Sequence, residues 1–351
     1  MAKRVLMAGN EAVGEGAIQA GCMAYYGYPI TPQNELIGYM AVHMPAKGRV
    51  FLQAESELAA VSMVLGSSAA GIRAMTSSSS PGISLKQEGI SYLAALELPA
   101  VIVNMQRGGP GLGNIAPGQA DYWQATRGGG HGDYRCIVLA PHCVQEMFSI
   151  AYDAFDLADK YRMVVLVLGD GRLGQMMEPV EVPDFPDKTP PPRPYALDGC
   201  KGRPARKLRS LFLNEDRLEE LNNRLQETYR RAAAEVRFEE TSTHDADVVM
   251  VAYGTCARVC KEALREARNE GLKVGLIRPI TLWPFPAGPI KKAAQHGAKF
   301  LVVEMSAGQM IDDVRLSLDR PAEVRFYGRT GGNVPQWDVA LGVIRDMIKG
   351  R

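Results

Sequence analysis

The sequence predicts an α/β protein of two domains, each built on a mainly parallel sheet flanked by helices. Three observations lead to this prediction. The chain has 351 residues, about twice the length of a typical domain. Hydrophobic residues make up 46% of it, which is ample for two cores. Nearly continuous apolar runs alternate with segments of helical period, a pattern typical of parallel strands that helices cover on both faces.

The first domain is expected over residues 1–182. Its apolar runs have the length of buried strands, and most lead into a segment with apolar residues at helical spacing. We predict strands at 23–30, 49–54, 72–78, 98–107, 136–141 and 162–171, and helices at 31–44, 55–71, 81–97 and 142–161. A long glycine-rich loop, residues 105–133, follows the fourth strand.

Residues 183–245 are expected to connect the domains. The stretch VPDFPDKTPPPRPY is typical of a semi-rigid connector. In the helix predicted after it, Asn214 is the expected N-cap, and one face carries Leu218, Leu221, Leu225, Tyr229, Ala232 and Val236. A single apolar face indicates a linker helix packed on the protein, since a partner-binding coiled coil needs a longer repeat.

The second domain, residues 246–351, repeats the alternation on a smaller scale. Strands are predicted at 246–254, 272–279, 299–305 and 323–328, and helices at 255–271, 286–297 and 308–319. Gly271 and Gly297 stand where helix C-caps are expected.

Charge and hydropathy narrow the class of protein. The formal net charge of +1 gives no electrostatic reason to expect nucleic acid or an anionic membrane as a partner. The N-terminal apolar stretch is too short for a signal peptide, and no run approaches the roughly 20 residues of a membrane helix. We therefore expect a soluble, cytoplasmic protein.

The six cysteines are scattered, without a C-x-x-C pair. Four-iron clusters usually draw thiolates from closely spaced cysteines, so no cluster and no other metal site is expected in this chain. Cys256 and Cys260 share a helix face and are expected to be small buried residues.

Ligands of open parallel sheets bind at the carboxyl ends of the strands. In the first domain this rule selects Thr31, the acidic pair Glu55 and Glu57, the serine run 77–80, and Arg107.

Each candidate also has a purely structural interpretation. Thr31 before a proline is typical of a helix N-cap with proline in the first turn, yet a hydroxyl at a helix N-terminus also binds anions. Glu55 and Glu57 suit the helix dipole or act as a general acid or base, and spacing does not decide between them. Arg107 is a surface residue or a bidentate carboxylate partner.

The glycine-rich loop holds Asp121, Arg127, His131 and Asp133. Long ordered loops are often functional, but its G-x-G-x-G is a weak dinucleotide signal because no helical pattern follows. His131 is interpreted as a turn or packing residue. Gly169-Asp170-Gly171 matches half of the Mg²⁺ motif of thiamine diphosphate enzymes, and the asparagine that completes the motif is missing, so Asp170 is interpreted as a strand-end turn residue.

Taken in order, several motifs resemble the α subunit of the 2-oxoacid:ferredoxin oxidoreductases, most closely the branched-chain class that acts on 2-oxoisovalerate. They are GYPITP, QAESELAAVSMVLGSSAAG, MTSSSSPGISLKQEGISYL, VNMQRGGPGLGN, GGGHGDY, VAYGTCARV and GLIRPITLWPFP. The resemblance covers nearly the whole chain.

The resemblance implies that thiamine diphosphate binds between two subunits, with this chain supplying the pyrimidine-side domain and a transketolase C-terminal-like domain. Glu57 would hydrogen-bond the aminopyrimidine ring nitrogen and favour the imino form that activates the thiazolium carbon. Ser78 and Ser79 would also contact the cofactor. Thr31 and Arg107 would contact the keto group and carboxylate of the 2-oxo acid.

The resemblance also implies partners. A β subunit would hold the diphosphate and Mg²⁺, and iron–sulfur clusters in β and in a ferredoxin-like subunit would carry electrons to ferredoxin, beside a γ subunit. The chain alone would be inactive. The implied reaction is oxidative decarboxylation of a 2-oxo acid with coenzyme A to an acyl-CoA and CO₂.

Alternatives remain at this point. A 2-oxoglutarate-specific α subunit would need a further cation or hydroxyl in its pocket, for whose wall Tyr28, Ile30 and residues 108–118 are the candidates. A non-catalytic scaffold subunit predicts that Glu57 is dispensable. A nicotinamide dehydrogenase lacks a convincing fingerprint.

Overall fold

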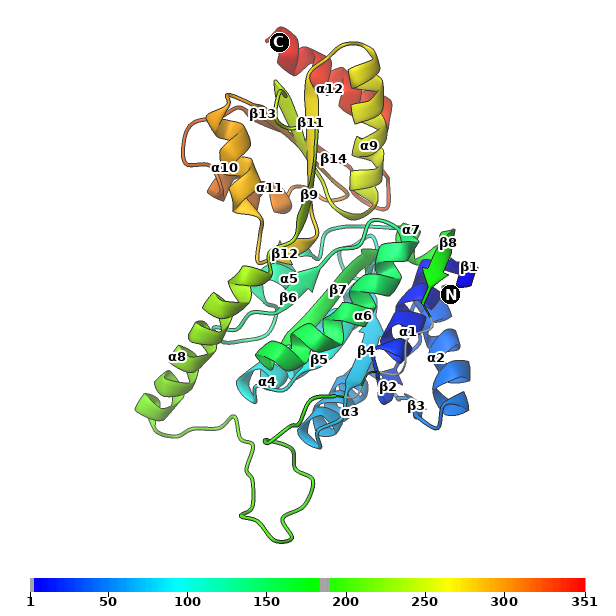
Figure 1. Cartoon of the computed structure of the whole chain (residues 1–351), viewed down its shortest axis with the longest axis vertical. Helices are drawn as coiled ribbons and strands as arrows, with labels where there is room; N and C mark the ends of the chain where they lie inside the picture. Colours follow the sequence, from blue (N-terminus) through cyan, green and yellow to red (C-terminus); the bar gives the residue numbers. More distant parts are fainter. Residues whose placement is uncertain (1–2, 184–187, 189, 351) are drawn as a thin grey trace.

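The structure is a computed structural model that describes residues 3–183, 188 and 190–350 (Figure 1). Within these residues it contains a seven-stranded sheet, a five-stranded sheet and a two-stranded sheet. Figure 1 shows the five-stranded sheet beyond one end of the seven-stranded sheet, with the chain passing between them along helix α8 (Glu215–Ala232).

The seven-stranded sheet has the strand order β12-β6-β7-β5-β4-β2-β3. All its pairs are parallel except β12 with β6. The two central strands are buried along their whole length, as expected of strands covered on both faces. The strands are β2 Ala24–Gly27, β3 Val50–Gln53, β4 Ala74–Ser78, β5 Ala100–Gln106, β6 Ile137–Leu139, β7 Val164–Asp170 and β12 Thr281–Trp283.

Two close helix pairs pack on this sheet, α1 with α6 and α3 with α4. The helices of this part are α1 Gly9–Gln19, α2 Asn34–Ala46, α3 Glu57–Ala69, α4 Ser80–Ala95, α5 Tyr122–Arg127, α6 Val144–Tyr161 and α7 Gly171–Gln175. The predicted helices at 31–44, 55–71, 81–97 and 142–161 correspond to α2, α3, α4 and α6. The glycine-rich loop contains a helix that its composition did not predict, α5.

The five-stranded sheet has the order β14-β13-β10-β11-β9, with β9 antiparallel to its neighbour. Its strands are β9 Phe238–Thr241, β10 Val248–Val251, β11 Val274–Pro279, β13 Lys299–Glu304 and β14 Val324–Gly328. Helices α9 Gly254–Asn269 and α12 Trp337–Lys349 pack together, as do α10 Ala287–Gln295 and α11 Met310–Leu316 (Figure 1). Gly271 and Gly297 follow α9 and α10 with positive φ, as predicted.

Three pairings were not predicted from the sequence. Strand β1 (Lys3–Ala8) pairs antiparallel with β8 (Met177–Val182) in a sheet of their own. Strand β9 extends the second sheet, and β12, although it follows β11 in the chain, joins the first sheet. Strands β9 and β12, of four and three residues, carry too little periodicity to be recognised.

The linker helix is as expected in its main features. Asn214 caps α8 by accepting a hydrogen bond from the Arg217 backbone N–H at 3.0 Å. The predicted apolar face is buried at its centre, at Leu221, Leu225, Tyr229 and Ala232, whereas Leu218 and Val236 at its ends are exposed. The 3₁₀ helix η1 (Ala233–Glu235) follows. Part of the proline-rich connector, residues 184–187 and 189, lies outside the described residues.

Asp170 does more than end a strand. It caps α7 by accepting the N–H groups of Arg172 and Leu173, both at 3.1 Å. It also accepts two hydrogen bonds from Thr255 in the domain of the five-stranded sheet. The backbone N–H donates at 3.1 Å and the hydroxyl at 2.8 Å. This buried carboxylate therefore ties the end of β7 to the start of α9.

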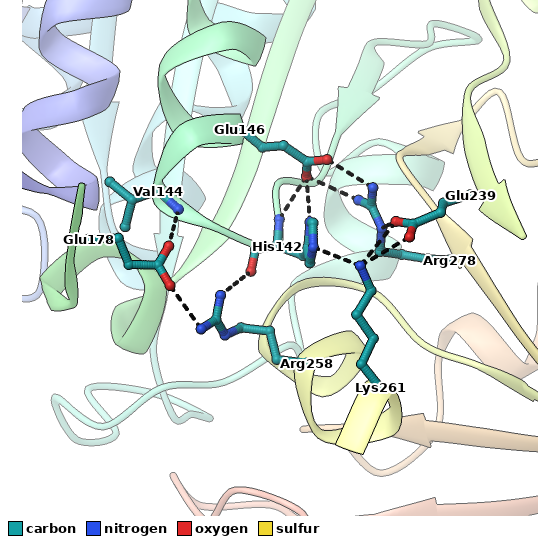
Figure 2. Close-up of polar contacts among 8 residues, drawn as sticks. All are labelled: His142, Val144, Glu146, Glu178, Glu239, Arg258, Lys261 and Arg278. Carbon is teal, nitrogen blue, oxygen red and sulfur yellow. Dashed lines mark hydrogen bonds and ion pairs between the residues drawn. The ribbon is translucent and has the colours of Figure 1, made fainter. Parts of the chain in front are cut away.

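A cluster of charged side chains joins the two sheets from the start of α6 (Figure 2). Arg278 of β11 donates to both oxygens of Glu146, at 2.8 and 3.0 Å, and to Glu239 of β9 at 2.8 Å. His142 lies between Glu146, 2.8 Å from its Nδ1, and Lys261 of α9, 3.0 Å from its Nε2. Burial by itself raises the pKa of Glu146, but the His142 hydrogen bond and the Arg278 charge hold it at about 2.

We predict that Glu146→Gln removes a stabilisation that depends on pH. The pKa of this carboxyl is lower in the folded protein, at about 2, than its ordinary value of 4.5. Its contribution is therefore complete above pH 4.5 and is lost as the pH falls towards 2. At neutral pH the variant should lose about 3 kcal/mol of unfolding free energy, and the difference from the wild type should shrink below pH 4.5.

Urea unfolding at several pH values measures this difference. Glu227→Gln is the control, because Glu227 forms an exposed pair with Arg230 on α8, which contributes little. A Glu146→Gln deficit that stays constant from pH 7 to pH 3 would contradict the prediction.

Candidate cofactor and substrate site

Glu57 is the first residue of α3 and lies at the carboxyl-end edge of the sheet. Ser56 starts the helix by accepting the Ala59 N–H on its hydroxyl at 3.2 Å. Glu57 is buried, with 6% of its surface exposed, whereas Glu55 is exposed. The structure thus separates two glutamates that spacing could not, and only Glu57 points into the protein.

Glycine 82 allows the Glu57 carboxylate to meet the serine run. A Cβ on Gly82 would lie 2.5 Å from Glu57 Oε1 and closer still to Ser78 Oγ. The first turn of α4 therefore approaches both groups more closely than any side chain permits. Glu57 of α3 and Ser78 of β4 are brought together, as predicted from the strand ends.

Ser78 and Ser79 are fully buried, and neither hydroxyl oxygen has a hydrogen-bond partner in the described part of the chain. Buried polar groups are normally hydrogen-bonded, so two neighbouring exceptions need an explanation. The unpaired Ser78 hydroxyl beside a buried carboxylate, with the unpaired Ser79 hydroxyl next in the chain, suits a polar heterocycle with both donors and acceptors. The residues present therefore fit the aminopyrimidine of thiamine diphosphate.

Thr31 is not the cap of α2, which corrects the sequence-based prediction. The helix begins at Asn34, after Gln33. Thr31 and Pro32 occupy a turn closed by the Gln33 N–H donating to Ile30 O at 3.1 Å, and Pro32 likewise precedes the helix. Because these residues form a turn before the helix, the Thr31 hydroxyl does not cap the helix. It accepts a hydrogen bond from the Asn34 side chain at 3.2 Å.

Arg107 and Thr31 lie together, as predicted. The Arg107 guanidinium donates to Thr31 O at 3.0 Å and to Leu112 O at 2.8 Å. Its Nε is buried with no partner among the described residues. Arginine has five N–H donors, so this residue holds the loop at Leu112 and keeps donors for a ligand.

Two groups of buried polar residues lie behind the site, and their contacts were not predicted from the sequence. Gln33 is fully buried and accepts from Ser77 Oγ at 2.5 Å, and Ser77 Oγ is also 2.5 Å from the Tyr25 hydroxyl. Asp121, in the glycine-rich loop, accepts from Ser80 Oγ at 2.6 Å and Asn104 at 2.8 Å, and burial raises its pKa. Contacts between residues this distant in sequence leave no local signal.

Lys86 was missed as well. It is fully buried on α4, and its Nζ lies 3.1 Å from Thr76 Oγ1 and 3.4 Å from the Glu57 main-chain oxygen. The signal was present in the sequence, because Lys86 falls within the apolar stripe that Ile83 and Ile90 define on this helix.

The glycine-rich loop is ordered by its own hydrogen bonds and by the second domain. Gly108 N donates to Ala116 O at 2.8 Å, and the Asn114 side chain donates to Gly331 O at 3.0 Å. A cleft of about 660 Å³ lies between this loop, the start of α4 and the 305–309 and 330–332 segments. His131 is exposed and only its carbonyl is bonded, by Ser91 Oγ at 2.8 Å, which agrees with a turn residue.

All six cysteines are free, and Cys256 and Cys260 are fully buried on α9 as expected. Among the helices of the described residues, none has the length and apolar character that crossing a membrane requires.

Comparison with known proteins gives a consistent result. A family model described as pyruvate flavodoxin/ferredoxin oxidoreductase, thiamine diphosphate-binding, matches residues 15–240. A second model, the core domain II of pyruvate:ferredoxin oxidoreductase, matches residues 246–339.

Three proteins are similar to this chain to different degrees. The ketoisovalerate oxidoreductase subunit VorB of Methanothermobacter marburgensis is 50% identical over 343 residues, 97% of each chain. The 2-oxoglutarate synthase subunit KorA of the same organism is 37% identical, over 99% of this chain and 100% of its own. The solved 2-oxoglutarate:ferredoxin oxidoreductase of Magnetococcus marinus, with 2-oxoglutarate, coenzyme A and succinyl-CoA bound, superposes with a TM-score of 0.85 at 29% identity.

The superposition covers 98% of this chain and 65% of that of the Magnetococcus protein, so the chain spans just under two thirds of that relative. Its two α/β domains are those of thiamine diphosphate enzymes of this type. The chain belongs to the 2-oxoacid:ferredoxin oxidoreductase family, which confirms the family predicted from the sequence motifs.

Proposed function

We propose that this chain is the thiamine-diphosphate-binding subunit of an oxidoreductase that converts 2-oxoisovalerate, coenzyme A and oxidised ferredoxin to isobutyryl-CoA, CO₂ and reduced ferredoxin. The observation that carries the proposal is the buried Glu57 carboxylate beside the unpaired hydroxyl of Ser78, in a chain half identical to ketoisovalerate oxidoreductase subunits. Identity to the 2-oxoglutarate synthase subunits is lower, at 36–37%, so that alternative is less favoured.

Glu57 would act on the cofactor's pyrimidine ring. A carboxyl group at this buried strand end can hold a proton at the ring nitrogen without competition from water. Ser78 and Ser79 would supply the hydroxyl partners that the ring's amino group and second nitrogen need. When bound, thiamine diphosphate supplies the carbon nucleophile and the electron sink that amino-acid side chains lack.

Arg107 and Thr31 would hold the 2-oxo acid. The unpaired Nε and the remaining N–H donors of Arg107 can bind the substrate carboxylate. The Thr31 hydroxyl, on the turn to which Arg107 donates, would face the keto oxygen. Because Arg107 is already fixed by two backbone carbonyls, little conformational entropy is lost when it binds substrate.

The chain would work within a complex of several subunits, since its relatives are named as subunits. We infer that a β subunit holds the diphosphate and Mg²⁺, and that iron–sulfur clusters in partner subunits carry electrons to ferredoxin. The scattered positions of the six cysteines support this division of labour.

We predict that the native complex prefers 2-oxoisovalerate. With coenzyme A present, kcat/KM for ferredoxin reduction should be at least about tenfold higher for 2-oxoisovalerate than for 2-oxoglutarate or pyruvate. The assay is ferredoxin or viologen reduction by the anaerobically purified complex with each acid in turn. A preference for 2-oxoglutarate would contradict the substrate assignment and leave the mechanism standing.

We predict that Glu57→Gln lowers turnover by about 10²–10⁴-fold, because an amide cannot exchange a proton with the ring nitrogen. Glu55→Gln is the matched control. It lies two residues away on the exposed side and should keep full activity. Full turnover by an assembled Glu57→Gln complex would favour the scaffold hypothesis.

We predict that Arg107→Lys raises KM for the 2-oxo acid about tenfold to a hundredfold, because an ammonium cannot bind both backbone carbonyls and a carboxylate in the plane of a guanidinium. Arg320→Lys, an exposed substitution, serves as control. Steady-state kinetics with 2-oxoisovalerate measure the effect, and an equal KM for the two variants would contradict a substrate role.

A further inference from the structure

Lys86 occupies a position where a lysine is costly. Its side chain is fully buried, and its two recorded hydrogen-bond acceptors, Thr76 Oγ1 and the Glu57 main-chain oxygen, are neutral. No carboxylate lies within ion-pair distance of its Nζ in the described part of the chain. Burying an ammonium without a direct ion pair is unfavourable, so a residue of this kind at a functional site needs a reason.

The packing of α4 against α3 places Lys86 under Glu57. Gly82 and Gly89 let the two helices approach, since a Cβ on Gly89 would lie 2.5 Å from Val61 Cγ1 of α3. Lys86 stands between these glycines, one turn after Gly82, on the same face of α4. The carboxylate of Glu57 therefore faces Gly82, and its main-chain oxygen faces the Lys86 ammonium.

The electrostatics couple the same two residues. Burial lowers the pKa of Lys86 to about 8, and the Glu57 carboxylate acts in the opposite direction. Among the described residues, Glu57 is the charged neighbour that favours the protonated form of Lys86. The positive charge of Lys86 is retained at neutral pH because the carboxylate is near.

We propose that Lys86 is a positioning residue for Glu57, holding the first turn of α3 through the Glu57 carbonyl and supplying the buried positive charge that offsets its carboxylate. This inference rests on the proposed function, in which Glu57 serves the cofactor. Thr76 in turn orients the ammonium through its hydroxyl. A neutral side chain at position 86 would fill the space but would leave the Glu57 charge buried without compensation.

The test compares the complexes carrying Lys86→Met and Lys86→Gln with the wild type. Methionine keeps a similar volume without charge, and glutamine also keeps a donor for Thr76 Oγ1. Glu88→Gln is the matched control, because it removes a charge on the exposed side of the same helix. Two readouts are needed, the pH profile of kcat/KM for 2-oxoisovalerate and the protonation of Glu57 itself.

Protonation of Glu57 is measured without turnover, in the complex stripped of thiamine diphosphate. The infrared band of the protonated carboxyl is assigned to Glu57 by its loss in Glu57→Gln, and its intensity is followed against pH. In both neutral Lys86 variants the band should persist to a pH about one unit higher than in the wild type, and the acidic limb of the kinetic profile should move by the same amount. Glu88→Gln should leave both unchanged.

The outcomes separate the two proposals. If Glu57→Gln abolishes turnover while the Lys86 variants match the wild type in both pH dependences, the proposed function stands and the role of Lys86 is overturned. If Glu57→Gln keeps full turnover, the proposed function fails, and the positioning role with it. If one neutral variant fails to assemble, the other decides. If both fail, Lys86→Arg, which retains the charge, must assemble with the wild-type profiles, and its failure overturns the proposal.

Discussion

The close contact between α3 and α4 is the constraint on which the site depends. It is possible only because Gly82 and Gly89 lack side chains where α4 crosses the Glu57 carboxylate and Val61. Where Glu57, Ser78 and Lys86 are buried by this contact, each polar group needs a partner among its neighbours or in a ligand.

The rest of the molecule holds this contact in place and connects it to the second domain. Arg107 fixes the turn at Thr31 and the loop at Leu112, while Asp121 holds Ser80 at the start of α4. Gln119 crosses between the sheets, donating to Tyr253 O and accepting from the Met305 N–H, both at 2.9 Å. Asp170 and the Glu146–Arg278 cluster (Figure 2) make the same connection further along the edge. The second domain thus braces the loop that carries the substrate-binding candidates.

The buried polar groups of this site lower the stability of the fold. A buried lysine without a direct ion pair and two buried hydroxyls without partners all disfavour folding. Proteins tolerate such groups where the surrounding structure fixes them and where a ligand completes them. These polar groups are buried here although each of them disfavours folding. Together they support a cofactor site at this place more strongly than any one residue does.

The sequence by itself determined the alternation of strands and helices, the two-domain organisation, the linker helix and the family, because apolar periodicity, caps and motifs are local and survive without contacts. It also brought Thr31, Glu57, the serine run and Arg107 to one edge, since the carboxyl ends of parallel strands must meet there. Only the tertiary structure decided that Glu57 and not Glu55 is buried, that Thr31 sits in a turn and not at a helix cap, and that β12 joins the first sheet. Burial and the partners of Lys86 depend on how closely two helices pack, and that distance is set by residues far apart in the chain.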